Sequence, residues 1–283
     1  MTRSGVGTAL MLLLASGAPL GCASSKRSEV VEPPRPAHAG ASDLILLDPG
    51  QPPLSELSYS LRAGASEQLL VSEQLTVYSA EREIGCVTLT SPLQVVVRSA
   101  ARDHFVLDLA LGPPEVERTG ETSILQLAGL AADDARGRSK RLLAKVMVGK
   151  GGRPVSFDLV SRGHPPRLEG TLDTLLALGA SPGEPLGVGA RWQVRSRQPG
   201  AHTESDFELL GLAGGVARFR VWRVQVPDET PARRLRAFGE WKFQSAHWPM
   251  RGQDRMSFSL PHAPDSRVSA RFLVRSRELP NPL

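Results

Sequence analysis

The chain has 283 residues, of which 41% are hydrophobic and 22% charged, a composition typical of a globular protein and not of a disordered chain. No apolar run after residue 22 approaches the ~20 residues that a transmembrane helix needs. Basic residues outnumber acidic ones by 34 to 29, but basic and aromatic side chains do not alternate as in surfaces that stack bases, so we expect no nucleic-acid partner.

The first 22 residues have the layout of a secretion signal. Arg3 supplies a positive charge, and residues 6–16 form an apolar core too short to span a bilayer. A run of small residues follows and ends in Gly21-Cys22. In these features the chain resembles bacterial lipoproteins with a type II signal peptide.

The resemblance implies cleavage after Gly21 and attachment of diacylglycerol to the sulfur of Cys22. Because residue 23 is alanine and not aspartate, it also implies the outer membrane. The chain departs from the family pattern at Pro19, where leucine is usual. The alternative is an ordinary secretory signal, cut near Ala18 or Ala23. Residues 1–21 are thus expected to be a signal peptide.

Residues 22–56 are rich in proline, which favours extended polyproline II structure and predicts a lipid-anchored tether. An apolar island at residues 44–47 interrupts the tether. We expect it to dock as an edge strand; a plug that binds a partner is the alternative. The remainder, residues 57–283, is predicted to form one domain.

Short alternating runs separated by turn residues dominate residues 57–283 and predict an antiparallel sheet. The predicted fold is mainly β, with α+β as an alternative: a twisted antiparallel sheet in a partial barrel or sandwich, with one or two short helices. The expected strands are 69–77, 83–89, 93–98, 104–111, 142–148, 155–160, 193–197, 204–212, 216–226, 233–245, 255–260 and 268–277. In strand 216–226 a bulge is expected between Val221 and Trp222, where the exposed face changes.

Two segments have helical character. Residues 171–178 predict a helix with Thr171 as its N-cap and Gly179 as its stop. Residues 123–135 are helical in composition but contain a glycine, and a short helix or an irregular segment is expected there. The glycine cluster at 149–154 lacks the spacing of a phosphate-binding loop and predicts a hairpin turn.

Cys22 and Cys86 are the only cysteines. If Cys22 carries lipid, Cys86 has no partner within the chain, and the fold cannot depend on a disulfide. Cys86 lies in a predicted strand, where we expect a small buried hydrophobic side chain; a reactive thiol is the alternative.

The stretch 185–192 resembles a segment of certain uncharacterised secreted β-rich bacterial proteins. The residues that carry the resemblance are Pro185, Gly187, Gly189 and Trp192. The resemblance implies an envelope domain that is all-β or α+β, with an incomplete barrel like those of lipid-carrying lipoproteins. The pattern of the following strand places Trp192 in the core.

No arrangement of residues predicts catalysis, a metal or a cofactor: the six histidines are scattered, and no serine-nucleophile motif occurs. The unusual surface feature is a set of arginines on the outer faces of two strands. These candidate contacts to an anionic partner are Arg191, Arg195, Arg197, Arg271 and Arg275. A solvated sheet face kept soluble by its charge is the alternative.

The sequence therefore predicts a non-enzymatic, exported cell-envelope lipoprotein, held at the membrane by its lipid, whose β domain binds a hydrophobic small molecule. One alternative is a scaffold with a filled core that binds an envelope protein, and another is a hydrolase with an unrecognised site. The deciding feature is whether the sheet encloses an open apolar cavity or a packed core.

Overall fold

A computed structural model describes residues 43–120, 141–161, 166–198, 201–227, 235–260 and 263–277. Within them the protein is mainly β, with one helix, α3 (Pro166–Leu178). The strands are β1 (Asp43–Asp48), β2 (Gln51–Glu56), β3 (Ser66–Ser79), β4 (Arg82–Ala100), β5 (His104–Leu111), β6 (Glu115–Gly120), β7 (Leu142–Gly149), β8 (Pro154–Leu159), β9 (Pro185–Val188), β10 (Arg191–Gln198), β11 (Ala201–Ala213), β12 (Val216–Pro227), β13 (Leu235–Gln244), β14 (His247–Leu260) and β15 (Ala263–Ser276). The predicted fold class is confirmed.

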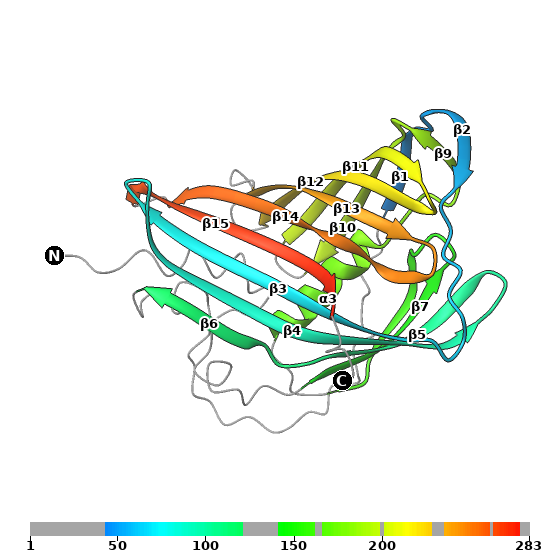
Figure 1. The fold of residues 1–283 in the computed structure, drawn as a ribbon, viewed down its shortest axis with the longest axis horizontal. Coiled ribbons are helices and arrows are strands. Elements are labelled where there is room, and N and C mark those ends of the chain that lie inside the picture. The colour runs from blue at the N-terminus through cyan, green and yellow to red at the C-terminus, as the bar shows by residue number, and fades with distance from the viewer. Residues whose placement is uncertain are drawn as a thin grey trace, which may run out of the picture.

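Most of these strands form one antiparallel sheet in the order β1-β10-β11-β12-β13-β14-β15-β3-β4-β5-β7-β8, while β6 pairs with β4 and β2 pairs with β9. The terminal strands of this order, β1 and β8, do not pair with each other, so the sheet is not closed into a barrel. Figure 1 shows the sheet curling so that α3 lies against its concave side.

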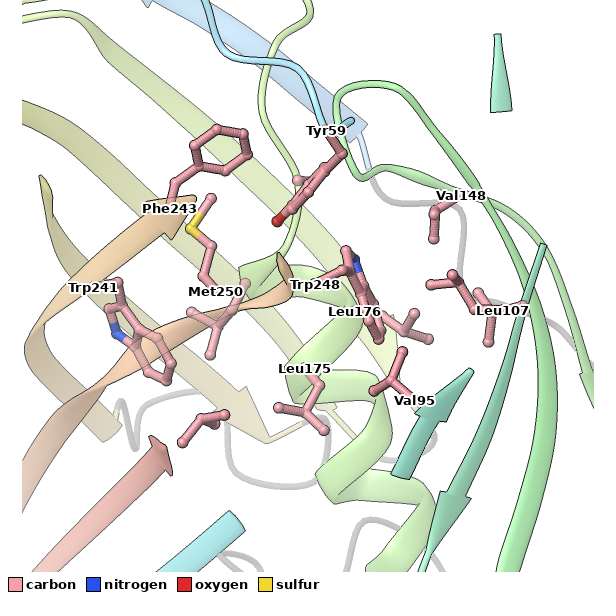
Figure 2. Close-up of a cluster of buried hydrophobic side chains, with 14 of the residues drawn as sticks. Tyr59, Val95, Leu107, Val148, Leu175, Leu176, Trp241, Phe243, Trp248 and Met250 are labelled. Carbon is pink, nitrogen blue, oxygen red and sulfur yellow. The ribbon is translucent and has the colours of Figure 1, made fainter. Parts of the chain in front are cut away.

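The concave side is filled by the apolar face of α3. Five leucines of this helix, at 168, 172, 175, 176 and 178, are buried in the same core as the inward side chains of the strands. Burial of each contributes roughly 1.5–3 kcal/mol. Figure 2 shows Leu175 and Leu176 in this core, with Trp241 and Met250 on one side, Leu107 and Val148 on the other, and Trp248 beside Leu176.

The predicted alternation is confirmed in most strands. The even-numbered side chains of β10 up to Val194 point inward, and Trp192 is completely buried against Phe207, with ring centroids 5.1 Å apart. The hairpin predicted at residues 149–154 joins β7 to β8. The island at 44–47 forms the edge strand β1, as predicted.

Residues 51–56, which also lie in the range assigned to the tether, form β2. The part of the chain with regular structure therefore begins no later than Asp43. Residues 1–42, with the proposed cleavage and lipidation sites Gly21 and Cys22, lie outside the described residues, as does the segment 123–135.

The prediction of two strands separated at Ser91-Pro92 is wrong, because β4 runs through both residues. On one edge β4 pairs with β6 as far as Thr90 and with β5 from Leu93 onward. Pro92 falls between the two partners, where an N–H is not needed for either ladder, and its carbonyl accepts a bond from the Gly112 N–H at 2.8 Å.

Three further expectations are corrected. The helix begins at Pro166, a favourable first helical residue because its N–H is not needed there, so Thr171 is not the N-cap. Cys86 is only partly buried, and its Sγ accepts a bond from Gln74 Nε2 at 3.3 Å on the outer face. The register of β12 with both neighbours continues unbroken past Val221 and Trp222, so no bulge changes the exposed face there.

Candidate functional site

Three charged side chains interrupt the apolar inner face of the sheet. Glu73 on β3 lies on the same face as the buried Val71 and Leu75. Arg223 on β12 lies on the same face as the buried Val221. Asp254 on β14 is in phase with Trp248 and Met250. The period of two places all three on the concave side, opposite to the solvated outer surface.

Arg223 and Asp254 form a buried ion pair, with 2.8 Å between Arg223 Nη2 and Asp254 Oδ2. Their side chains are only 16% and 4% exposed. Burial raises the pKa of the Asp254 carboxyl, and the charge of Arg223 opposes that rise. Gly239 lies opposite Asp254 on β13, where a Cβ would come within 2.6 Å of the Asp254 Cβ, so a larger residue cannot occupy this position without displacing the pair.

A cavity of about 120 Å³ opens beside this ion pair, between α3 and the sheet. Thr171 on α3 donates a hydrogen bond from its Oγ1 to Glu73 Oε1 at 2.7 Å and so connects the helix to β3 across the cavity. The walls combine apolar side chains with polar ones: Leu75, Met256, Ala270 and Phe272 with Glu73, Thr171, Thr174, Thr203, Ser205, Arg223 and Asp254.

This arrangement can hold a small amphipathic group. Its charged members can bind a polar head, and its apolar members can contact a hydrocarbon portion. Its volume is below the ~300–1,000 Å³ of typical small-molecule sites and corresponds to a few water molecules at about 30 Å³ each. A hydrocarbon chain enters only if α3 moves away from the sheet.

One further acidic group on α3 is electrostatically perturbed. Burial, together with the nearby Glu169 one turn earlier in the helix, raises the pKa of Asp173 to about 6. At neutral pH the helix therefore carries a partly buried carboxylate whose charge is unfavourable where it lies.

The arginines predicted to contact an anionic partner are not brought together as one surface. Arg191 and Arg195 lie on β10, whereas Arg271 and Arg275 lie on β15, and four strands separate β10 from β15. The side chain of Arg197 lies outside the described residues.

On the β10 side, acidic residues accompany the arginines. Arg195 pairs with Glu204 at 3.4 Å, and Arg191 stands opposite Glu208. Two neighbouring pairs continue this pattern across the outer face: Arg220–Glu208 at 3.4 Å and Arg218–Glu240 at 3.5 Å. These exposed pairs make the surface locally neutral, and each contributes little to stability.

On the β15 side, Arg271 and Arg275 line a groove of about 520 Å³ on the outer face of β15, β3 and β4, bounded by β6. The groove also includes Arg277, Glu115 and Glu117. Gln74 and Arg271 border both this groove and the cavity on the other side of the sheet.

Comparison with known protein families and with curated proteins finds no match to this chain. The helix in the described ranges is not long and apolar enough to cross a membrane. Among the side chains of the same ranges, no group of three or more His, Cys, Asp or Glu is placed to hold a metal ion.

The sequence prediction missed Glu73, Arg223 and Asp254, although each left a signal. All three are charged residues at positions in phase with an apolar face. The bulge expected between Val221 and Trp222 would have placed Arg223 on the outer face, so its position on the apolar face was not recognised.

Proposed function

We propose that the protein is an exported, lipid-anchored envelope protein whose β domain binds an amphipathic molecule between α3 and the concave face of the sheet. The observation that carries the binding proposal is the buried pair Arg223–Asp254 beside a cavity with apolar walls. Buried charges are costly, and a paired set next to an opening is typical of a binding site. The lipid anchor is supported by the Gly21-Cys22 pattern.

Binding of a whole hydrocarbon chain requires α3 to move away from the sheet. The C-terminal end of the helix is fixed: the Tyr59 hydroxyl donates to the Gly179 carbonyl at 3.3 Å, and the Ser181 N–H donates to the Gly151 carbonyl at 2.7 Å. We expect the ligand to enter at the other end, beside the side-chain hydrogen bond from Thr171 to Glu73.

The binding site is tested with the full chain carrying Cys22→Ala, so that the anchor itself does not report as bound lipid. We expect mass spectrometry of the purified protein to detect a co-purified amphiphile, and a fluorescent fatty acid to bind. Ala270→Trp fills the cavity and should abolish binding. Ser269→Trp, one residue away on the outer face, is the matched control and should leave binding intact. Absence of both bound lipid and fatty-acid uptake would count against the binding proposal.

The anchor is tested separately, by comparing the wild type with Cys22→Ala in cells. The wild-type protein should fractionate with membranes, and its N-terminal peptide should carry the mass of a diacylglyceryl group. Cys22→Ala should lose both properties. Cys86→Ala, which removes the other cysteine, should retain them. Membrane fractionation of Cys22→Ala, without any lipid mass on the wild type, would refute the anchor.

The second candidate is an envelope scaffold that binds another protein through the edges of the sheet. It is favoured by the filled concave side and by exposed apolar residues on both terminal strands: Leu47 of β1 is 57% exposed and Val155 of β8 is 65% exposed. A photo-crosslinking residue at Leu47 should then give a discrete protein adduct in cells, and one at the exposed Ser55 of β2 should not. Equal labelling at both positions would argue against a specific edge contact.

A further inference from the structure

We propose that the outer groove on β15, β3, β4 and β6 binds a short polar zwitterion of about the length of a di- to tetrapeptide. In this complex the β15 arginines hold the carboxylate and the β6 glutamates hold the ammonium group. The groove faces away from the cavity beneath α3, so this inference does not rest on the proposed function.

Within the described ranges, the arginine wall differs from the β10 surface, where Arg195 pairs with Glu204. Arg275 and Arg277 make no ion pair with any side chain in the described ranges. Arg271 donates a hydrogen bond to Gln253, which is uncharged. The Nε of Arg271 is buried and has no hydrogen-bond partner among the described residues. Arg271 also stands directly opposite Arg255 on β14. Like charges in opposite positions destabilise a sheet, and a bound anion would relieve that repulsion.

The acidic wall is formed by Glu115 and Glu117 of β6, and neither comes within 4.0 Å of a basic group in the described part of the chain. The strand register explains why the two walls do not neutralise each other. Glu117 is opposite Thr88, Thr88 is opposite Gln74, and Gln74 is opposite Arg271. Arg271 and Glu117 thus lie at the two ends of a row of residues that crosses four strands. Three inter-strand spacings of ~4.8 Å separate their backbones by roughly 14 Å.

The floor between the walls combines hydroxyl groups with the apolar side chains of Leu70, Pro92 and Leu273. It carries the hydroxyl groups of Ser72, Thr88 and Thr90, and Ser72 Oγ is 3.1 Å from Thr90 Oγ1. The hydroxyl groups can form hydrogen bonds to the amides of a bound molecule, and the apolar side chains can contact its hydrocarbon portions. The volume of about 520 Å³ lies within the ~300–1,000 Å³ of small-molecule sites.

These features together specify the ligand class. Arginine binds carboxylates through parallel hydrogen bonds, and glutamate accepts from an ammonium group. An extended tripeptide spans about 10 Å, and flexible arginine and glutamate side chains can cover the remaining distance between the walls. A short peptide with free ends supplies the carboxylate, the ammonium group and the length that the groove requires.

The test uses the full chain with Cys22→Ala and three peptides: triglycine, N-acetyl-triglycine without the ammonium group, and triglycine amide without the carboxylate. Affinities are measured by NMR titration. Triglycine should bind saturably and more tightly than the other two. Arg275→Gln and Glu117→Gln should each weaken it about tenfold, as expected for loss of one charge-assisted contact. Both positions are exposed, and circular dichroism checks that the variants fold.

The pattern across peptides separates the two walls. Glu117→Gln should leave N-acetyl-triglycine unaffected, and Arg275→Gln should leave triglycine amide unaffected. Arg195→Gln removes an arginine of the neutral β10 surface and should change none of the affinities. Lack of saturable triglycine binding, or equal binding by the variants and the parent chain, overturns the inference. Ala270→Trp should not affect triglycine, so this result is independent of fatty-acid binding.

Discussion

Replacement of Asp173 by asparagine should stabilise the protein at neutral pH. Burial, reinforced by Glu169, raises the pKa of Asp173 to about 6, from a usual value of 3.8. The difference is about 2 pH units at 1.36 kcal/mol each, so the charged carboxylate costs the folded state about 3 kcal/mol above pH 6. Asp173→Asn keeps the shape of the side chain and removes the charge, so the free energy of unfolding at pH 7 should rise by up to about 3 kcal/mol.

The raised pKa of Asp173 also predicts how the stability of the protein changes with pH. Because the pKa of Asp173 is higher in the folded state, that state binds the proton first on acidification. Wild-type stability should therefore rise as the pH falls from about 6 towards 3.8, and Asp173→Asn should lack this contribution. Urea unfolding followed by circular dichroism between pH 4 and 8 measures both, with the exposed Asp158→Asn on β8 as control. The reasoning is refuted if wild type and Asp173→Asn show the same pH dependence, or if the variant is less stable at pH 7.

Two further predictions concern the inner face and the turn that supports α3. Arg223→Met leaves Asp254 buried without its partner and should lower the free energy of unfolding by about 3–5 kcal/mol, whereas the double variant Arg223→Met/Asp254→Leu should recover most of the loss, both by urea unfolding. The cost of the single variant should shrink on acidification, because Asp254 can then take up a proton; no recovery in the double variant would contradict this account. Gly152 has φ +79°, and a Cβ there would lie 2.1 Å from the Gly179 carbonyl oxygen. Gly183 has a similar φ of +78°, but the space around it is open, so Gly183→Ala should cost only the backbone strain of about 1–3 kcal/mol. Gly152→Ala should therefore lower the melting temperature far more than Gly183→Ala. Equal losses would show that the contact with Gly179 does not matter.

Local patterns in the sequence were sufficient for the fold class. Alternating apolar residues predicted the strands and, at Trp192, the inner face, because a period of two is a property of each strand alone. The edge position of residues 44–47 followed from their isolation in a proline-rich stretch. The start of α3 was not predicted, because the helix extends beyond its most apolar portion and Thr171 serves a contact with β3 instead of a cap.

Strand order could not be predicted, since it depends on pairings between distant residues. The arginines of β10 and β15 have the same alternating pattern in sequence, yet the first set lies beside glutamates of β11 and the second faces a groove. The strand register therefore decides whether an arginine lies beside a glutamate, as on β10, or faces a groove, as on β15. By contrast, Glu73 could have been predicted from the sequence, because it is in phase with the apolar Val71 and Leu75 of an expected strand. Asp254 is in phase with Met256 but precedes the strand expected at 255–260, so it was overlooked.

The two candidate sites depend on the same strand pairing. On β15, Phe272 faces the cavity beneath α3, while Arg275 faces the outer groove. The pairing of β15 with β3 continues from Ser266 opposite Ser79 to Ser276 opposite Leu69 without a register shift. A slip of one residue would exchange the two faces and place Arg275 in the core. The buried apolar residues of β15 therefore fix the position of the groove arginines, so a substitution that keeps the inner face intact can change one site without changing the other.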